Sequence, residues 1–300
     1  MTQTSLIRCR AAAVAVIAGL AAGVLAVPTA EVATGTATAA HASSWRIARS
    51  SPANAEPAKA VAVTCPEDSV PYAGGGAVVY GPAGNGGAAL TAIVPDVAAR
   101  AVVVAATAPP GQTADWAVVA YAICSTFDLD PQVVVRTGPG TATAPCPGDK
   151  ALYGAGFHVA GDPAAGHVTG IDLNPDVTAV RVTAGGPGAA TADVTAIAVC
   201  LPAGLPTKLV HAGNDAAGWP KLVTRRDNDP ELKPYATGAT VTGPDAATLD
   251  AVVPASDDGV SWARGTLYGG AAPRFAAGDE GGDGDGGSVG LETALIGTFH

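Results

Sequence analysis

Residues 146–157 read CPGDKALYGAGF, and residues 193–200, which close the same segment, read DVTAIAVC. Between these ends lie short apolar runs that are interrupted by Gly, Pro, Asp and Asn. Short runs bounded by turn-forming residues are typical of β-strands, and the segment has no helical period of useful length. A related segment at residues 65–124 precedes it, and a third, without cysteines, follows it. The sequence therefore predicts an all-β protein of three pseudo-repeats.

Each of the first two repeats opens and closes on a cysteine. Cys65 and Cys146 are both followed by proline, and Cys124 and Cys200 both end an apolar run. In the third repeat the equivalent positions fall near Asn228 and Gly297, so both cysteines are missing together. Joint loss is explained better by a bonded pair than by two independent thiols. We therefore predict the disulfides Cys65–Cys124 and Cys146–Cys200.

Each repeat offers about four strand candidates, at residues 70–80, 88–94, 100–107 and 116–124 in the first copy. A single sheet of four strands cannot bury its own apolar face, so the repeats need one another. We expect antiparallel sheets packed around a pseudo-threefold axis, as in a β-prism. Three small tandem β-sandwich units are the alternative. The connections between repeats could each add an edge strand.

The N-terminal residues have the pattern of a secretory signal peptide. Arg8 and Arg10 precede an apolar run at residues 11–27, and Ala40-His41-Ala42 fits a small-x-small cleavage site. Cleavage after Ala30 and a retained membrane anchor are the alternatives. The prediction is a secreted, extracellular protein with oxidised cysteines and no membrane contact after cleavage.

The expected division of the chain follows from these patterns. By residue number it comprises a signal peptide (1–42), a disordered segment (43–60), repeat 1 (61–127), a linker (128–144), repeat 2 (145–202), a second linker (203–223) and repeat 3 (224–300), the last with a Gly/Asp-rich insertion at 278–288.

The charge pattern excludes some partners. The chain of 300 residues has a formal net charge of −10, and its basic residues form no cluster in the sequence. This argues against binding to nucleic acid or to anionic membranes.

The Gly/Asp-rich insertion contains the metal-site candidate. Asp283, Asp285 and Glu292 stand at the third, fifth and twelfth positions of a possible Ca²⁺ loop, and Gly286 stands at the sixth. The first position is glycine and no helices are expected on either side. The alternative is an acidic insertion at a solvent-exposed tip. Apart from calcium, no cofactor is expected.

Two short matches to catalytic motifs are attributed to chance. Residues 286–290 read GGSVG and fit GxSxG, but they lack the strand before and the helix after that a nucleophile elbow needs. His41 lies in a protease-like TAAH segment, within the signal peptide.

Repeat 2 has a polar set of its own: His158, His167, Asp172, Asn174 and Asp176. Two histidines with an aspartate could bind a metal or transfer protons, although such residues more often decorate loops. Asp96 and Asp176 both follow proline and are interpreted as turn residues that accept backbone N–H groups.

A tyrosine recurs once per repeat, as Tyr72, Tyr153 and Tyr235. We interpret these residues as packing positions, and a threefold set of sugar-stacking platforms is the alternative.

The pattern of Cys-Pro, Tyr-x-Gly/Ala-Gly and a closing Ala-x-Cys resembles repeats of uncharacterised secreted proteins from high-GC Gram-positive bacteria. That resemblance implies no activity and no catalytic residues. We expect a secreted non-enzymatic β-repeat protein that acts as a binding or surface-associated module, with a polysaccharide or the cell wall as partner. An extracellular hydrolase with a site assembled from separate repeats and a calcium-stabilised adhesive module are the alternatives.

Overall fold

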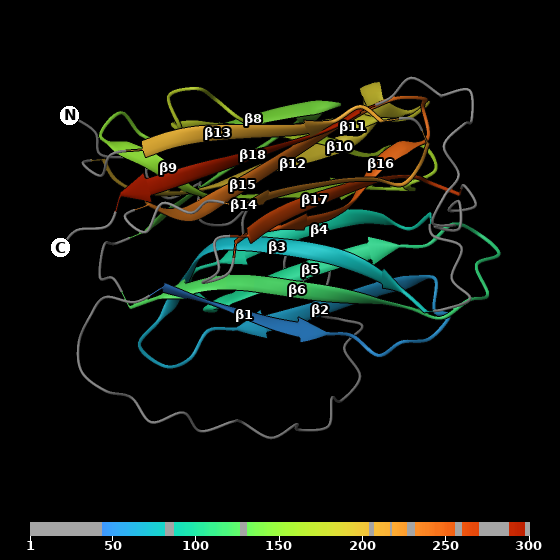
Figure 1. Cartoon of the computed structure of the whole chain (residues 1–300), viewed down its shortest axis with the longest axis horizontal. Helices are drawn as coiled ribbons and strands as arrows, with labels where there is room; N and C mark the ends of the chain where they lie inside the picture. The colour runs from blue at the N-terminus through green and yellow to red at the C-terminus, as the bar shows by residue number, and fades with distance from the viewer. Residues whose placement is uncertain are drawn as a thin grey trace, which may run out of the picture. The chain divides into compact units, whose positions relative to one another are not determined.

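The computed structural model describes residues 44–81, 87–126, 131–203, 207–216, 218–226, 232–255, 260–269 and 288–297. The expected signal peptide lies outside these residues. All strands belong to the compact unit Ala42–His300. The described residues form antiparallel β-strands and one 3-10 helix (Figure 1), so the all-β prediction is confirmed.

Each repeat has six strands in the part of the chain that the structure describes. In repeat 1 they are β1 (Ser44–Ser50), β2 (Ala58–Thr64), β3 (Val70–Tyr80), β4 (Ala89–Asp96), β5 (Ala101–Thr107) and β6 (Trp116–Ser125). In repeat 2 they are β7 (Gln132–Pro139), β8 (Thr141–Pro145), β9 (Lys150–Ala160), β10 (His167–Leu173), β11 (Ala179–Gly185) and β12 (Asp193–Pro202), with the 3-10 helix at Ala189–Thr191. In repeat 3 they are β13 (Thr207–Asn214), β14 (Lys221–Arg226), β15 (Leu232–Thr242), β16 (Ala247–Val253), β17 (Val260–Leu267) and β18 (Ser288–Gly297).

This count corrects the expected four strands per repeat. The segment 43–60, expected to be disordered, contains β1 and the start of β2. The expected linkers 128–144 and 203–223 contain β7, most of β8, β13 and the start of β14. These connections do add edge strands, because β1, β2, β7, β8, β13 and β14 are the six sheet edges.

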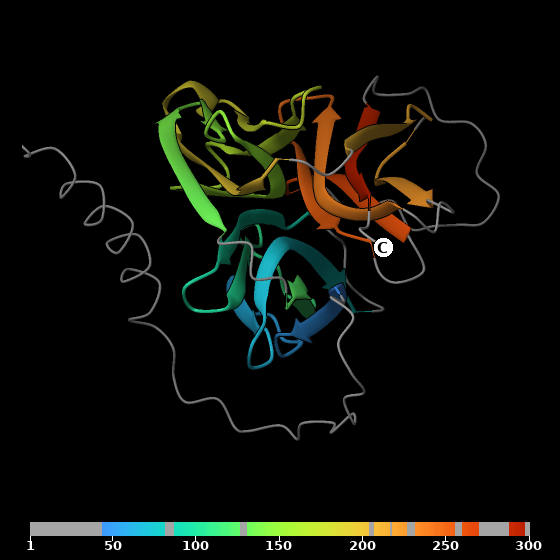
Figure 2. The same ribbon diagram turned by 90° about the vertical axis from the view of Figure 1, so that its left-hand side faces the viewer.

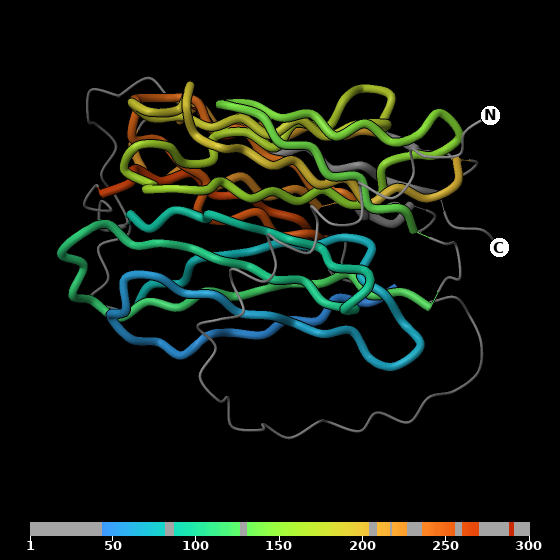
Figure 3. Tube along the Cα trace, turned by 180° about the vertical axis from the view of Figure 1, so that it is seen from behind, coloured from blue at the N-terminus to red at the C-terminus, as the bar shows by residue number. Residues whose placement is uncertain are grey.

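The strands form three six-stranded sheets, and each sheet is shared by two repeats. Sheet A has the order β1-β6-β3-β16-β17-β14, sheet B the order β2-β5-β4-β9-β12-β7, and sheet C the order β13-β18-β15-β10-β11-β8. Each sheet thus contains the first, sixth and third strands of one repeat, followed by the fourth, fifth and second strands of another. The third strand of the one repeat pairs with the fourth strand of the other. This exchange recurs three times, which is the predicted pseudo-threefold arrangement. The three repeats form separate colour groups in Figure 2, and Figure 3 traces the chain from behind.

A glycine occupies the same register position at each junction between repeats: Gly75 in β3, Gly156 in β9 and Gly238 in β15. A Cβ added to these residues would lie 2.5, 2.5 and 2.2 Å from the carbonyl oxygens of Val252, Ile93 and Ile171, respectively. No side chain fits at such distances. Glycine is therefore what allows the third strand of one repeat to approach the fourth strand of its neighbour.

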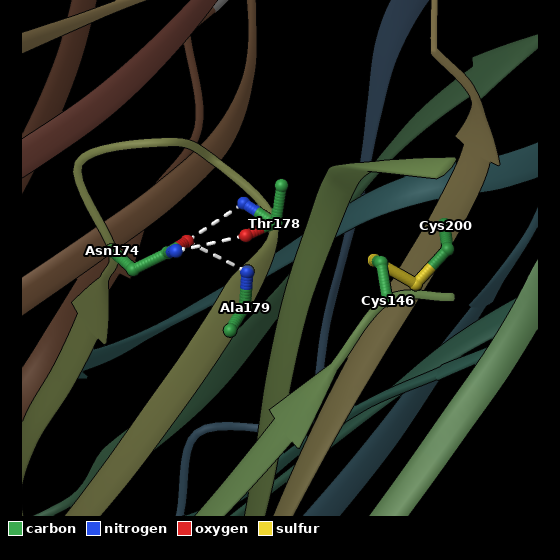
Figure 4. Close-up of a disulfide and its surroundings, with 5 residues drawn as sticks. All are labelled: Cys146, Asn174, Thr178, Ala179 and Cys200. Carbon is green, nitrogen blue, oxygen red and sulfur yellow. Dashed lines mark hydrogen bonds between the residues drawn. A yellow bond between two sulfur atoms is a disulfide. The ribbon is translucent and has the colours of Figure 1, made fainter. Parts of the chain in front are cut away.

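The main hydrophobic cluster contains residues from all three repeats, and both predicted disulfides are present. Cys65 follows β2 of sheet B and pairs with Cys124 in β6 of sheet A. Cys146 follows β8 of sheet C and pairs with Cys200 in β12 of sheet B (Figure 4). Each bridge therefore ties together the two sheets to which one repeat contributes.

Repeat 3 has no such bridge. Pro234 pairs with Leu295, as Pro71 pairs with Cys124, so Leu295 occupies the register position of the closing cysteine. The sequence pattern predicts that position two residues later, near Gly297.

Candidate functional site

The face of sheet A that points away from the main core carries the candidate site, which we call face A. Register defines it: Tyr121 pairs with Gly75 and with Ala48, and Trp262 pairs with Val253 and with Thr224. Because side chains alternate between the two faces of a strand, these residues share one face. Face A therefore combines an aromatic residue from repeat 1 with one from repeat 3.

A small hydrophobic cluster underlies face A. Ala77, Ala251 and Val253 are fully buried, and the half-buried rings of Tyr121 and Trp262 pack against them. Val79 and Leu222 lie on the same face and are 48% and 46% exposed. Leu222 lies two residues from Thr224, the partner of Trp262, so an exposed apolar side chain borders the aromatic row.

Arg46 of β1 connects the two repeats across face A. Its guanidinium lies over the ring of Tyr121, 5.4 Å from the ring centroid, and its Nη1 donates to the carbonyl oxygen of Pro254 at 3.0 Å. Burial raises the pKa of the Tyr121 hydroxyl above its ordinary value, and the charge of Arg46 opposes that rise. The phenol therefore stays protonated as a hydrogen-bond donor.

A buried ion pair lies at the same junction. Asp250 is 1% exposed and occupies a bulge in β16, at the register position held by Thr91 and Thr169 in the other repeats. Arg264 of β17 donates from Nε to both carboxylate oxygens, and the Tyr80 hydroxyl lies 3.4 Å from Oδ2. The backbone N–H of Ala88 donates to that hydroxyl at 3.0 Å.

The charges in this cluster stabilise one another. Burial raises the pKa of Asp250, and the charge and hydrogen bonds of Arg264 offset part of the rise. Burial would lower the pKa of Arg264, but Asp250 raises it above the ordinary value. Burial, together with the charge of Asp250, also raises the pKa of Tyr80. The cluster therefore holds the junction together, and its polar groups already have partners.

Two buried lysines occupy equivalent positions on β2 and β14. Lys59 pairs with Ala106 and lies 5.0 Å from the ring of Trp116, while Lys221 pairs with Gly265 and lies 5.3 Å from the ring of Trp219. Lys59 donates to Pro52 and Asn54, and Lys221 donates to Ala216. Burial lowers the pKa of Lys59. Both ammonium groups are committed to contacts inside their own repeat.

The polar set predicted in repeat 2 does not converge on one site. His167 is buried, with Nδ1 3.1 Å from the carbonyl of Pro163 and Nε2 2.9 Å from that of Ala247. His158 pairs with Thr195 and Ala92 on the outer face of sheet B, where burial lowers its pKa. The two histidines therefore lie in different parts of the fold and do not form a pair.

The remaining members of that set have local roles. Asp172 accepts from Arg181 and from Thr240. The Asn174 side chain accepts from the backbone N–H groups of Thr178 and Ala179, both at 2.7 Å (Figure 4).

Asp96 and Asp176 were both predicted to accept backbone N–H groups in turns, and the structure shows such a hydrogen bond for Asp96. Asp96 accepts from the backbone N–H of Ala99 at 2.9 Å. Asp176 is exposed, and in its turn Asn174 accepts the backbone N–H groups instead.

The recurring tyrosines are packing residues in repeats 1 and 2. Tyr72 and Tyr153 are 0% and 2% exposed and share a cluster with Ile123 and Leu201. A buried ring cannot serve as a platform for a sugar. The side chain of Tyr235 lies outside the described residues.

The calcium candidate is not described by the structure: Asp283 and Asp285 lie outside the described residues, and only the backbone of Glu292 is placed, in β18. His41 and residues 286–287 of the GxSxG match also lie outside them. Among the described residues no group of three or more His, Cys, Asp or Glu side chains could hold a metal ion.

Face A was not visible in the sequence. Tyr121 and Trp262 are 141 positions apart, by subtraction of their numbers, and belong to strands that meet only when repeats 1 and 3 pair. The available signal was the position of Tyr121 between residues that face the core. In an alternating strand this places its ring on the opposite face.

No family model matches the chain, and no curated protein matches its sequence. Within the residues that the structure places, no helix is long and apolar enough to cross a membrane.

Proposed function

We propose that this protein is a secreted, non-enzymatic binding module that attaches to an extracellular polysaccharide or to the cell wall. One observation carries the proposal: the buried ionisable pair of the candidate site is used to join repeats, whereas aromatic and apolar side chains remain accessible beside it. Asp250 and Arg264 form the pair, and Val79 and Leu222 are the accessible side chains.

The chemistry of face A suits a sugar chain. Aromatic rings offer flat apolar surfaces with a polar tip, which pack against the apolar faces of sugars while hydroxyl groups hydrogen-bond nearby. Face A provides the half-buried ring of Trp262 with Thr224 beside it, and in the same register row the ring of Tyr121, which Arg46 covers. The disulfides support an oxidising compartment, where such polymers occur.

The test is a co-sedimentation assay with the full chain, recovered from the medium of an exporting host. Purified cell walls and insoluble polysaccharides are incubated with the protein, and depletion from the supernatant is measured. Reducing ends released from the same polymers are measured in parallel. Depletion without release supports a binding module, and release of reducing ends would contradict it. A protein that stays in the cells of the exporting host would contradict secretion.

A further inference from the structure

The structure concentrates cationic residues on one sheet of an acidic protein. The described strands of sheet A contain six cationic residues, Arg46, Arg49, Lys221, Arg225, Arg226 and Arg264, and a single acidic residue, Asp250. Six against one gives these strands a formal charge of +5, whereas the whole chain has −10. On the same count the strands of sheets B and C each have three cationic and two acidic residues, or +1.

Burial divides the cations of sheet A into two groups. Lys221 is buried, and Arg264 is neutralised by Asp250. Arg49 and Arg226 are exposed, and Arg46 and Arg225 are half-buried. The surplus positive charge therefore lies on the two edge strands, β1 and β14, where solvent reaches it.

Register places two of these cations beside the aromatic residues. Arg46 precedes Ala48, the partner of Tyr121, by two residues. Arg226 follows Thr224, the partner of Trp262, by two residues. Strands β1 and β14 run in opposite directions, so both arginines lie towards the same end of the sheet. Because side chains alternate along a strand, both arginines lie on the same face as the aromatic residues. Face A thus has an aromatic row and, at one end of it, an arginine on each edge strand.

We propose that face A binds an anionic polysaccharide, with a sugar ring against Trp262 and acidic groups beside the edge arginines. This inference rests on the proposed function and adds the position of the site and the charge of the ligand. Charge complementarity favours an anionic polymer over a neutral one, because Arg46 and Arg226 place positive charge on face A of an acidic molecule and attract anions there. The disulfides favour an extracellular polymer over nucleic acid.

The test measures affinity of the full, exported chain for soluble alginate and polygalacturonate, with dextran and barley β-glucan as neutral polymers. We expect binding to the two polyuronates, weakened by raising the salt from 50 to 500 mM, because salt screens exposed charges. Trp262→Ala is expected to weaken it by about tenfold or more, as loss of an aromatic anchor does. Arg226→Gln is expected to weaken it by about twofold to fivefold, as for an exposed charge pair.

The matched control is Arg181→Gln, which removes the same charge from the outer face of sheet C, where Arg181 is 60% exposed. Its affinity should equal that of the unmodified chain. An equal loss in this control, or equal affinity for neutral polymers, would overturn the inference and leave the binding function standing. Equal affinity for single-stranded DNA or poly-glutamate would overturn the choice of polysaccharide. Failure to bind any polysaccharide or cell wall would overturn the proposed function too.

Discussion

Arg264 spans both carboxylate oxygens of Asp250, with its Nε 2.8 Å from Oδ1 and 3.0 Å from Oδ2. Nη2 of the same guanidinium donates to the carbonyl oxygen of Val78 in repeat 1 at 2.6 Å. Sheet A joins the first and third repeats, which are not consecutive in the chain, whereas sheets B and C join consecutive repeats. One side chain therefore neutralises a buried acid and fixes the contact between the two ends of the described fold.

Asp250→Ala should destabilise the protein strongly. The substitution leaves the guanidinium of Arg264 with no counter-charge in a largely buried position, which typically costs about 3–5 kcal/mol. The urea unfolding midpoint at pH 7, followed by tryptophan fluorescence, measures the loss.

Arg181→Ala is the comparison for that variant. It breaks the Arg181–Asp172 pair, whose side chains are 60% and 24% exposed. Exposed pairs contribute about 0–1 kcal/mol, so the midpoint should move little. Equal shifts in the two variants would show that the Asp250 pair has no special role.

His158 should make the protein sensitive to mild acid. Burial lowers its pKa below the ordinary 6.5, so the unfolded chain binds a proton at a higher pH than the folded protein does. The stabilising contribution is present above pH 6.5 and is lost as the pH falls below that value. Repeat 3 has Thr240 at the equivalent position, so His158→Thr is expected to fold.

The measurement compares the urea midpoint of the two proteins at pH 7.5 and at pH 5. The unmodified protein should lose more stability over this interval than His158→Thr does. Parallel losses would mean that His158 does not titrate differently on folding.

Valine at any of the three junction glycines should destabilise the fold. In Gly75→Val, Gly156→Val and Gly238→Val, the new Cβ would lie within 2.5 Å of a carbonyl oxygen of the neighbouring repeat. Overpacking of this kind typically costs about 1–3 kcal/mol, and here backbone must move to relieve it. Thermal unfolding should show lowered midpoints for all three.

Gly148→Ala is the control for those variants, because a Cβ there meets nothing within 4 Å. It should unfold at nearly the unmodified temperature. Unchanged midpoints in the three valine variants would contradict the close approach at the junctions.

The sequence was sufficient to predict the disulfides and the threefold relationship, because the first two repeats each begin and end on a cysteine and the third repeats their apolar pattern. Joint loss of both cysteines in repeat 3 identified the pairs Cys65–Cys124 and Cys146–Cys200, which the structure contains. Tyr72 and Tyr153 were likewise interpreted correctly as packing residues.

Strand β1 was missed, and edge strands in the connections between repeats were only considered possible, because arginine and lysine weaken the apolar pattern of several edge strands. β1 reads SWRIARS and β14 reads KLVTRR, so arginine and lysine interrupt the alternation that marks a strand. Charged residues are frequent on edge strands, where they oppose pairing with other chains. The expected count of four strands per repeat was therefore too low.

The Asp250–Arg264 cluster could not be predicted from sequence either. Val78 lies 186 positions before Arg264, and their contact exists only because sheet A joins non-consecutive repeats. Neither residue belongs to a motif whose spacing would indicate the pairing.

The most direct test of shared sheets is a cysteine cross-link between repeats 1 and 3. Ala77 and Ala251 lie directly opposite each other in sheet A. Opposed residues of antiparallel strands have Cα atoms about 4.5–5.5 Å apart, which suits a disulfide. Peptide mapping of the oxidised Ala77→Cys/Ala251→Cys variant should find a 77–251 bridge beside the two native ones, and the Ala77→Cys/Val133→Cys control should find no new bridge. Free thiols at residues 77 and 251 in a folded protein would contradict the shared sheet, and separate tandem sandwiches would then replace it.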